Sequence, residues 1–223
     1  MELNELPLNL CEPMKRKMRN EFAVDINSIL PSQVNRKLTT YSVNWNSLLL
    51  LIDLKDKNSQ FNSLVVDRVS GFTLVKQTTN VLMKELWKDN RLSLTKIKML
   101  AAYCKIKKNI PYVRKDVQLL RLKPIDHCKR NTSWIAYHNL HHVIRMGDDR
   151  LEIYFNDLAT PIYIDGTYSF IKKQEETSYK IRSMEEMICN QVNNLFGYQK
   201  NCHFNYQSPD NDDYFADLMK LIK

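Results

Sequence analysis

Glycine is scarce in this chain. Only 4 of the 223 residues are glycine, and no two of them are near neighbours in the sequence. The dinucleotide-binding G-x-G-x-x-G turn, the P-loop and the G-x-S-x-G nucleophile elbow all need closely spaced glycines. This scarcity excludes the common nucleotide-binding loops and the α/β-hydrolase elbow.

Cysteines are few, and long apolar runs are missing. The five cysteines are an odd number without C-x-x-C spacing, so neither a disulfide framework nor a zinc ribbon is expected. The longest strongly apolar run, Leu48 to Ile52, is far shorter than the ~20 residues of a membrane-spanning helix. The N-terminus lacks the apolar centre of a signal peptide. We therefore expect an intracellular protein without a membrane partner, in the nucleus or the cytoplasm, and the charge pattern favours the nucleus.

Positive charge is present in excess and is concentrated in one segment. The chain has 33 Lys and Arg against 25 Asp and Glu, a net charge of +8. Residues 96–130 contain eleven basic and two acidic residues, a local net charge of +9, so the remainder is nearly neutral. A concentrated basic stretch is typical of proteins that bind a phosphate backbone, and a solvated lysine-rich face is the alternative. The expected DNA-binding residues are Lys96, Lys98, Lys105, Lys107, Lys108, Arg114, Lys115, Lys129 and Arg130.

Hydrophobic spacing predicts an α+β fold, with helices and antiparallel strands. Helices are expected after Pro13, over 81–87, 94–103, 134–146 and 184–196, and over 22–38 with a break at Pro31. Strands are expected over 39–54, 64–66, 72–75, 113–122, 151–155, 161–164 and 167–171.

The composition divides the chain into three regions. Residues 1–90 form an N-terminal α+β region, residues 91–200 a basic α+β region, and residues 201–223 a polar spacer with an amphipathic helix. On that helix, Tyr214, Phe215 and Leu218 either pack on the protein's own core or bind a partner protein.

Three histidines form the densest cluster of residues that could carry chemistry. His138, His141 and His142 make an H-x-x-H-H pattern on an expected helix, where two imidazoles could share a metal ion. Asn139 stands where a hydrolytic zinc helix has glutamate, so histidines on the surface of a helix are the other interpretation. No catalytic triad can be identified from spacing, and we expect no catalytic residues and no cofactor.

The order of elements between Leu119 and Ile164 carries a family resemblance. A strand ends in a Leu-x-x-x-Pro-like turn at 119–128, the segment 132–144 follows, and 151–164 alternates strand, polar turn, proline and apolar strand. Residues 117–171 in this way resemble the second domain of checkpoint DNA sliding-clamp subunits of the Rad-nine type. The resemblance implies a clamp-like α+β fold without an active site. It also implies binding to DNA and to other clamp-like subunits, and a role in DNA replication, repair or checkpoint signalling.

The N-terminal region suggests a different function. Leu6-Pro7-Leu8 and the segment 29–38 resemble the opening and the closing helix of an F-box. That resemblance implies an adaptor for ubiquitin transfer. The adaptor, and a metal-dependent enzyme that uses His138 and His141, are the alternatives to a DNA-binding factor that contacts the backbone without reading the sequence.

Overall fold

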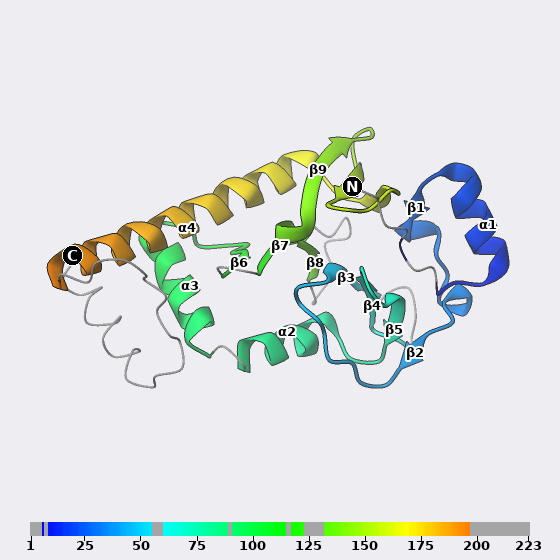
Figure 1. The fold of residues 1–223 in the computed structure, drawn as a ribbon, viewed down its shortest axis with the longest axis horizontal. Helices are drawn as coiled ribbons and strands as arrows, with labels where there is room; N and C mark the ends of the chain where they lie inside the picture. The colour runs from blue at the N-terminus through cyan, green and yellow to red at the C-terminus, as the bar shows by residue number, and fades with distance from the viewer. Residues whose placement is uncertain are drawn as a thin grey trace.

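Two β-sheets packed face to face form the centre of the molecule (Figure 1). The computed structural model describes residues 6, 9–54, 60–88, 91–114, 117–122 and 132–196. The smaller sheet has the order β1 (Val24–Asp25), β11 (Ile162–Asp165), β10 (Arg150–Phe155), β9 (Leu140–Arg145). The larger sheet has the order β2 (Lys37–Leu38), β5 (Gly71–Val75), β4 (Ser63–Asp67), β3 (Leu48–Asp53), β8 (Ser133–Ala136), β7 (Gln118–Leu122), β6 (Tyr112–Val113).

Most neighbouring strands are antiparallel, and the described residues form four α-helices outside the two sheets. Only the pairs β1–β11 and β2–β5 are parallel among the described strands. The helices are α1 (Glu12–Glu21), α2 (Thr79–Lys88), α3 (Arg91–Tyr103) and α4 (Tyr168–Phe196). Short 3-10 turns occur at Ile26–Ser28, Pro31–Gln33 and Tyr137–Asn139. The α+β class expected from the sequence is confirmed.

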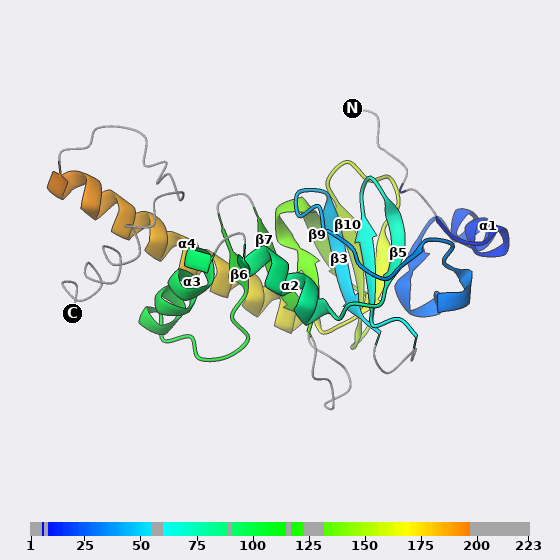
Figure 2. The same cartoon turned by 90° about the horizontal axis from the view of Figure 1, so that it is seen from below.

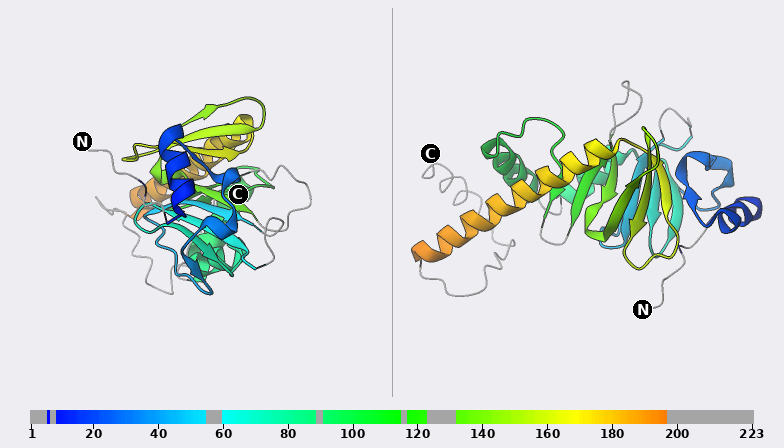
Figure 3. Two further views of the ribbon diagram at one scale, coloured as in Figure 1. Left: turned by 90° about the vertical axis from the view of Figure 1, so that its right-hand side faces the viewer. Right: turned by 90° about the horizontal axis from the view of Figure 1, so that it is seen from above.

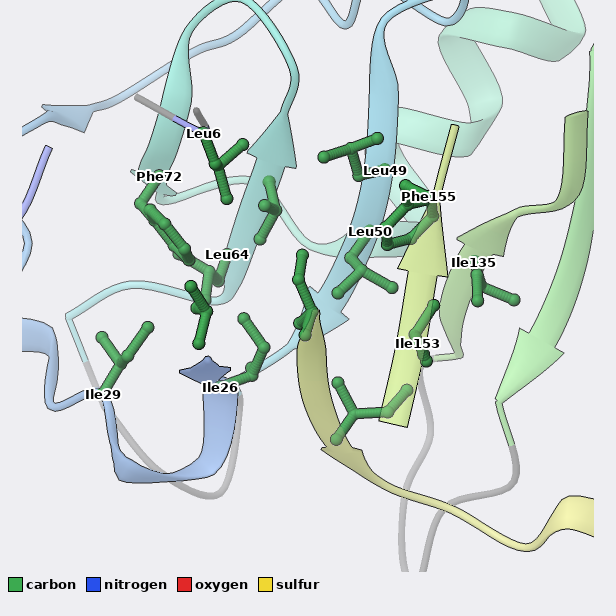
Figure 4. Close-up of a cluster of buried hydrophobic side chains, with 14 of the residues drawn as sticks. Leu6, Ile26, Ile29, Leu49, Leu50, Leu64, Phe72, Ile135, Ile153 and Phe155 are labelled. Atoms are coloured by element: carbon green, nitrogen blue, oxygen red, sulfur yellow. The ribbon is translucent and has the colours of Figure 1, made fainter. Parts of the chain in front are cut away.

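The main core lies between the two sheets. Along β10, Leu151, Ile153 and Phe155 are buried while the residues between them are more exposed, because successive side chains of a strand point to opposite faces. They meet side chains of the larger sheet such as Leu50 and Phe72 (Figure 4).

The larger sheet is buried on both faces, which makes the molecule three layers deep. Its second face places Leu48, Leu51 and Val65 against Leu82 and Ile97 of the helices α2 and α3 (Figure 2). A strand buried on both faces is apolar along its whole length, which explains the uninterrupted leucine run of β3.

Helix α4 leaves the sheets and runs along α3. Ile181 and Ile188 of α4 pack with Leu100 and Ala101 of α3 and with Val113 of β6. Figure 3 shows α4 extending well beyond the strands toward one end of the molecule. None of the helices within the described ranges combines the length and the apolar character needed to cross a membrane.

Several predicted elements are confirmed. The hairpin expected around Ser70-Gly71 is β4–β5, with Gly71 at φ 68°. The strands expected at 151–155 and 161–164 are β10 and β11, and the helices expected over 81–87 and 94–103 are α2 and α3.

Three predicted elements are wrong. The helix expected over 22–38 is replaced by β1, two 3-10 turns and β2, because these short strands pair with β11 and β5. The closing F-box helix expected at 29–38 is therefore not formed. The helix expected over 134–146 is β8, a 3-10 turn and β9, and the strand expected over 167–171 begins α4. In each case tertiary packing outweighs the local hydrophobic spacing.

The larger sheet also crosses the boundary placed at residue 90. Strand β3, from the first region, lies between β4 and β8, and β8 comes from the second region. The main core contains residues from both regions, so the residues on the two sides of position 90 share one core.

Candidate nucleic-acid interface

The loop between α3 and β6, residues 104–111, carries three lysines and begins at the C-terminal end of α3. The N–H of Lys105 donates to the carbonyl of Ala102, and the N–H of Ile106 donates to the carbonyl of Ala101, at 2.9 and 2.7 Å. This is the bonding of a Schellman motif, in which one residue adopts the left-handed conformation. Lys105 is that residue, with φ 60°.

Two isoleucines hold the loop against the helices. Ile106 packs with the cluster formed by α3 and α4, and Ile110 packs with the same cluster and with the core beneath it. Between them, Lys107 and Lys108 are exposed, as is Lys105. The isoleucines thus fix the backbone of the loop while its three lysines face solvent.

The same loop lies along α4. The Sγ atom of Cys104 is 3.8 Å from the carbonyl oxygen of Lys180, and the Nε2 of Gln174 donates to the carbonyl of Asn109 at 2.7 Å. Burial raises the pKa of the Cys104 thiol, and the nearby positive charge of Lys180 opposes that shift. The loop therefore runs beside α4 between Gln174 and Lys180 (Figure 1).

Two exposed lysines of α4 flank this loop. Lys173 and Lys180 are seven residues apart, which places them two turns apart on the same side of the helix. Both are exposed. We call Lys105, Lys107, Lys108, Lys173 and Lys180 the lysine cluster. Within the described part of the chain, none of the five forms an ion pair.

The neighbouring charges of α4 are mostly neutralised by partners on the same helix. Lys172 pairs with Glu175 at 2.7 Å, and Arg182 pairs with Glu186 at 3.0 Å. The exposed carboxylate of Glu176 lies one turn before Lys180 on α4. The lysine cluster is therefore a local excess of positive charge.

The structure separates other basic residues of the predicted segment from the cluster. Lys96 is largely buried and binds Glu185 of α4, with 2.6 Å between Nζ and Oε1. Lys98 is exposed, but residues two apart on a helix face different sides, so it points away from the α4 side that Lys96 occupies. Arg114 is half-buried at the end of β6. Lys115, Lys129 and Arg130 lie outside the described residues.

Arg121, within the same segment, has a structural role. Its Nε donates to the carbonyl of Ile110 at 3.2 Å, and its guanidinium lies 5.1 Å from the ring centroid of Trp134. Burial lowers the pKa of this guanidinium. These contacts hold the loop's C-terminal end and remove Arg121 from the exposed charges.

The three histidines do not share a helix. The Nε2 atom of His138 lies 3.0 Å from the carbonyl oxygen of Trp45, and its Nδ1 atom lies 3.2 Å from the backbone nitrogen and 3.1 Å from the carbonyl oxygen of Gln118. His142, in β9, stacks on Tyr154 at 4.3 Å between ring centroids, and His141 meets His142 edge to face. In the described ranges, no three His, Cys, Asp or Glu side chains are grouped to hold a metal ion.

Other predicted site residues are not covered. Tyr214, Phe215 and Leu218 lie outside the described residues. Lys173 and Lys180 were not among the residues expected from the sequence, because their part in the cluster depends on a loop from another segment. Their seven-residue spacing is the one signal in the sequence that could have indicated a shared helix face.

Comparison with protein-family models, with curated proteins and with solved structures finds no match to this chain.

Proposed function

We propose that this protein binds DNA and that the lysine cluster contacts the phosphate backbone. The observation that carries the proposal is the convergence of five exposed lysines from a loop and from α4, none of them in an ion pair with a described residue.

The chemistry of the cluster supports backbone contact rather than base recognition. Lysine carries a compact point charge on a flexible stem, which suits contact with phosphate and does not discriminate bases. The loop backbone is fixed by Ile106, Ile110 and two side-chain hydrogen bonds, so the backbone that carries Lys105, Lys107 and Lys108 is held in place before any ligand arrives. Binding of this kind releases counterions from DNA and weakens as salt is added.

A salt titration tests the proposal. Affinity of the full chain for a mixed-sequence duplex is measured by fluorescence anisotropy at increasing salt. Five phosphate contacts predict a slope of log K against log [salt] of about −4.5, since each contributes ~0.9. An affinity independent of salt would refute backbone binding.

A triple variant, with a matched control, localises the contact. Lys105→Ala, Lys107→Ala and Lys108→Ala together should lower affinity on the order of 100-fold and bring the slope to about −1.8. Lys98→Ala removes an exposed lysine from the same segment but outside the cluster, and it should change affinity less than about twofold. Equal losses in the two proteins would show that the cluster is not the site.

A further inference from the structure

Phe22 is unusual both in the exposure of its side chain and in its backbone conformation. Its side chain is 81% exposed, the highest value among the large apolar residues described as exposed. Its backbone is left-handed, with φ 50°, a conformation that disfavours residues with a Cβ atom. Unfavourable backbone conformations tend to persist where the side chain has a function.

The surroundings of Phe22 fix its backbone and keep the ring in solvent. Its N–H donates to the carbonyl of Arg19, and the next N–H, of Ala23, donates to the carbonyl of Met18. Ala23 and Val24 are buried, and the N–H of Val24 donates to the carbonyl of Pro161 at 3.0 Å. The chain is thereby held on both sides of an outward-facing phenyl ring.

Helix α1, which ends at this ring, presents basic and amide side chains to solvent. Met14 and Met18 are buried and attach the helix to the core. Arg16, Arg19 and Asn20 are exposed, and their i, i+3, i+4 spacing places them on one face. Within the described residues, neither arginine forms an ion pair. Lys15 and Lys17 instead pair with Glu12 and Glu21.

We propose that Phe22, with Arg16 and Arg19, forms a second nucleic-acid contact in which the phenyl ring stacks on an unpaired base. Aromatic side chains stack on exposed bases of any identity, and arginines add contacts to the backbone and to base faces. The inference rests on the proposed function, which it extends from phosphate contact to base contact.

The ligand class follows from the chemistry of the site. Bases within an intact duplex are already stacked on each other, so a ring that needs a base face favours single strands, gaps and ends. Helix α1 lies at one end of the longest axis, and α3 with the loop that follows it lies on the other side of the sheets (Figures 1 and 2). A single nucleic acid that touches both sites must run along the molecule.

The test compares the full chain with Phe22→Gly, Phe22→Trp and Val81→Ala. The probes are a single strand of about 20 nucleotides and the duplex of the same sequence. Phe22→Gly should lower affinity for the single strand about tenfold and leave duplex affinity nearly unchanged. Phe22→Trp should keep single-strand affinity within about threefold. Val81→Ala, which removes an exposed apolar side chain from α2, should bind both probes like the parent.

Thermal stability separates loss of function from loss of fold. Glycine suits the left-handed conformation, so Phe22→Gly should raise the melting temperature by about 3 °C. Reduced single-strand binding in a protein that is at least as stable as the parent supports base stacking. If Phe22→Gly binds the single strand as tightly as the parent does, stacking by Phe22 is refuted.

Different results would refute the proposed function and the inference about Phe22. If the triple lysine variant binds duplex as the parent does, the lysine cluster is refuted, whatever Phe22 does. If the triple variant loses duplex binding while Phe22→Gly leaves single-strand affinity intact, only the inference about Phe22 is refuted. If the parent binds neither probe, both are refuted.

Discussion

Helices α1 and α3 end in the same way but present different side chains. Each closes with the two hydrogen bonds of a Schellman motif, and in each a residue other than glycine takes the left-handed position. That residue is Phe22 after α1 and Lys105 after α3, and both are exposed. Glycine would relieve the backbone at either position, in a chain that has only 4 glycines.

The C-terminal ends of α1 and α3 differ in the kind of ligand group that their side chains suit. Lys105 belongs to a group of lysines, point charges that suit phosphate. Phe22 follows a helix with exposed arginines and an asparagine, and its ring suits the face of a base. We therefore propose two kinds of contact on two identical backbone motifs: phosphate contact by the lysines, which depends on salt, and stacking by the Phe22 ring, whose own contribution is largely insensitive to salt.

The variant with the largest expected effect tests whether the two lysines of α4 contact DNA together with the loop lysines. Lys173→Glu with Lys180→Glu should lower duplex affinity on the order of 100-fold, because two phosphate contacts are replaced by repulsion. Anisotropy titrations at one fixed salt concentration measure the change. The control Lys98→Glu also reverses an exposed lysine, and it should cause a much smaller loss. A double variant that binds within threefold of the parent would remove α4 from the interface.

Part of the fold and part of the candidate site could be predicted from the sequence. The β4–β5 hairpin is marked by two apolar runs and Gly71, and β10 and β11 by apolar residues on either side of a polar turn. The concentration of lysines around α3 was likewise visible in the sequence.

The rest depends on contacts between distant segments. The turn before β9 is held by His138, which bonds to Trp45 and Gln118, and local spacing cannot reveal these partners. The lysine cluster forms because Gln174 and Lys180 lie beside the loop that follows α3. Exposure and left-handed backbone at Phe22 are likewise properties of the folded chain.

The substitution Lys105→Gly has a smaller expected effect and can be compared directly with Phe22→Gly at the end of α1. Lys105→Gly should stabilise the fold by about 1 kcal/mol through the relaxed backbone. It should also lower duplex affinity about fivefold, since one phosphate contact is lost, and reduce the salt slope by ~0.9. Thermal unfolding and anisotropy measure both changes. In contrast to Phe22→Gly, the loss must shrink at high salt; a loss that is constant across salt concentrations would contradict the assignment.

The smallest expected effect is a gain of affinity. Glu176 is exposed one turn before Lys180, where its carboxylate repels phosphate. Glu176→Lys should raise duplex affinity about threefold at moderate salt and steepen the salt slope by up to ~0.9. Asp149→Lys, on the exposed turn between β9 and β10 and in neither α4 nor the loop after α3, changes the total charge equally and serves as the matched control. If the two substitutions raise affinity equally, net charge rather than the lysine cluster determines binding.

Lysine protection tests the central claim most directly. The full chain is acetylated with and without duplex DNA, and the modification of each lysine is measured by mass spectrometry. We predict that DNA protects Lys105, Lys107, Lys108, Lys173 and Lys180 while Lys98 reacts equally in both samples. Unchanged reactivity of those five, or equal protection of Lys98, would contradict binding at the lysine cluster.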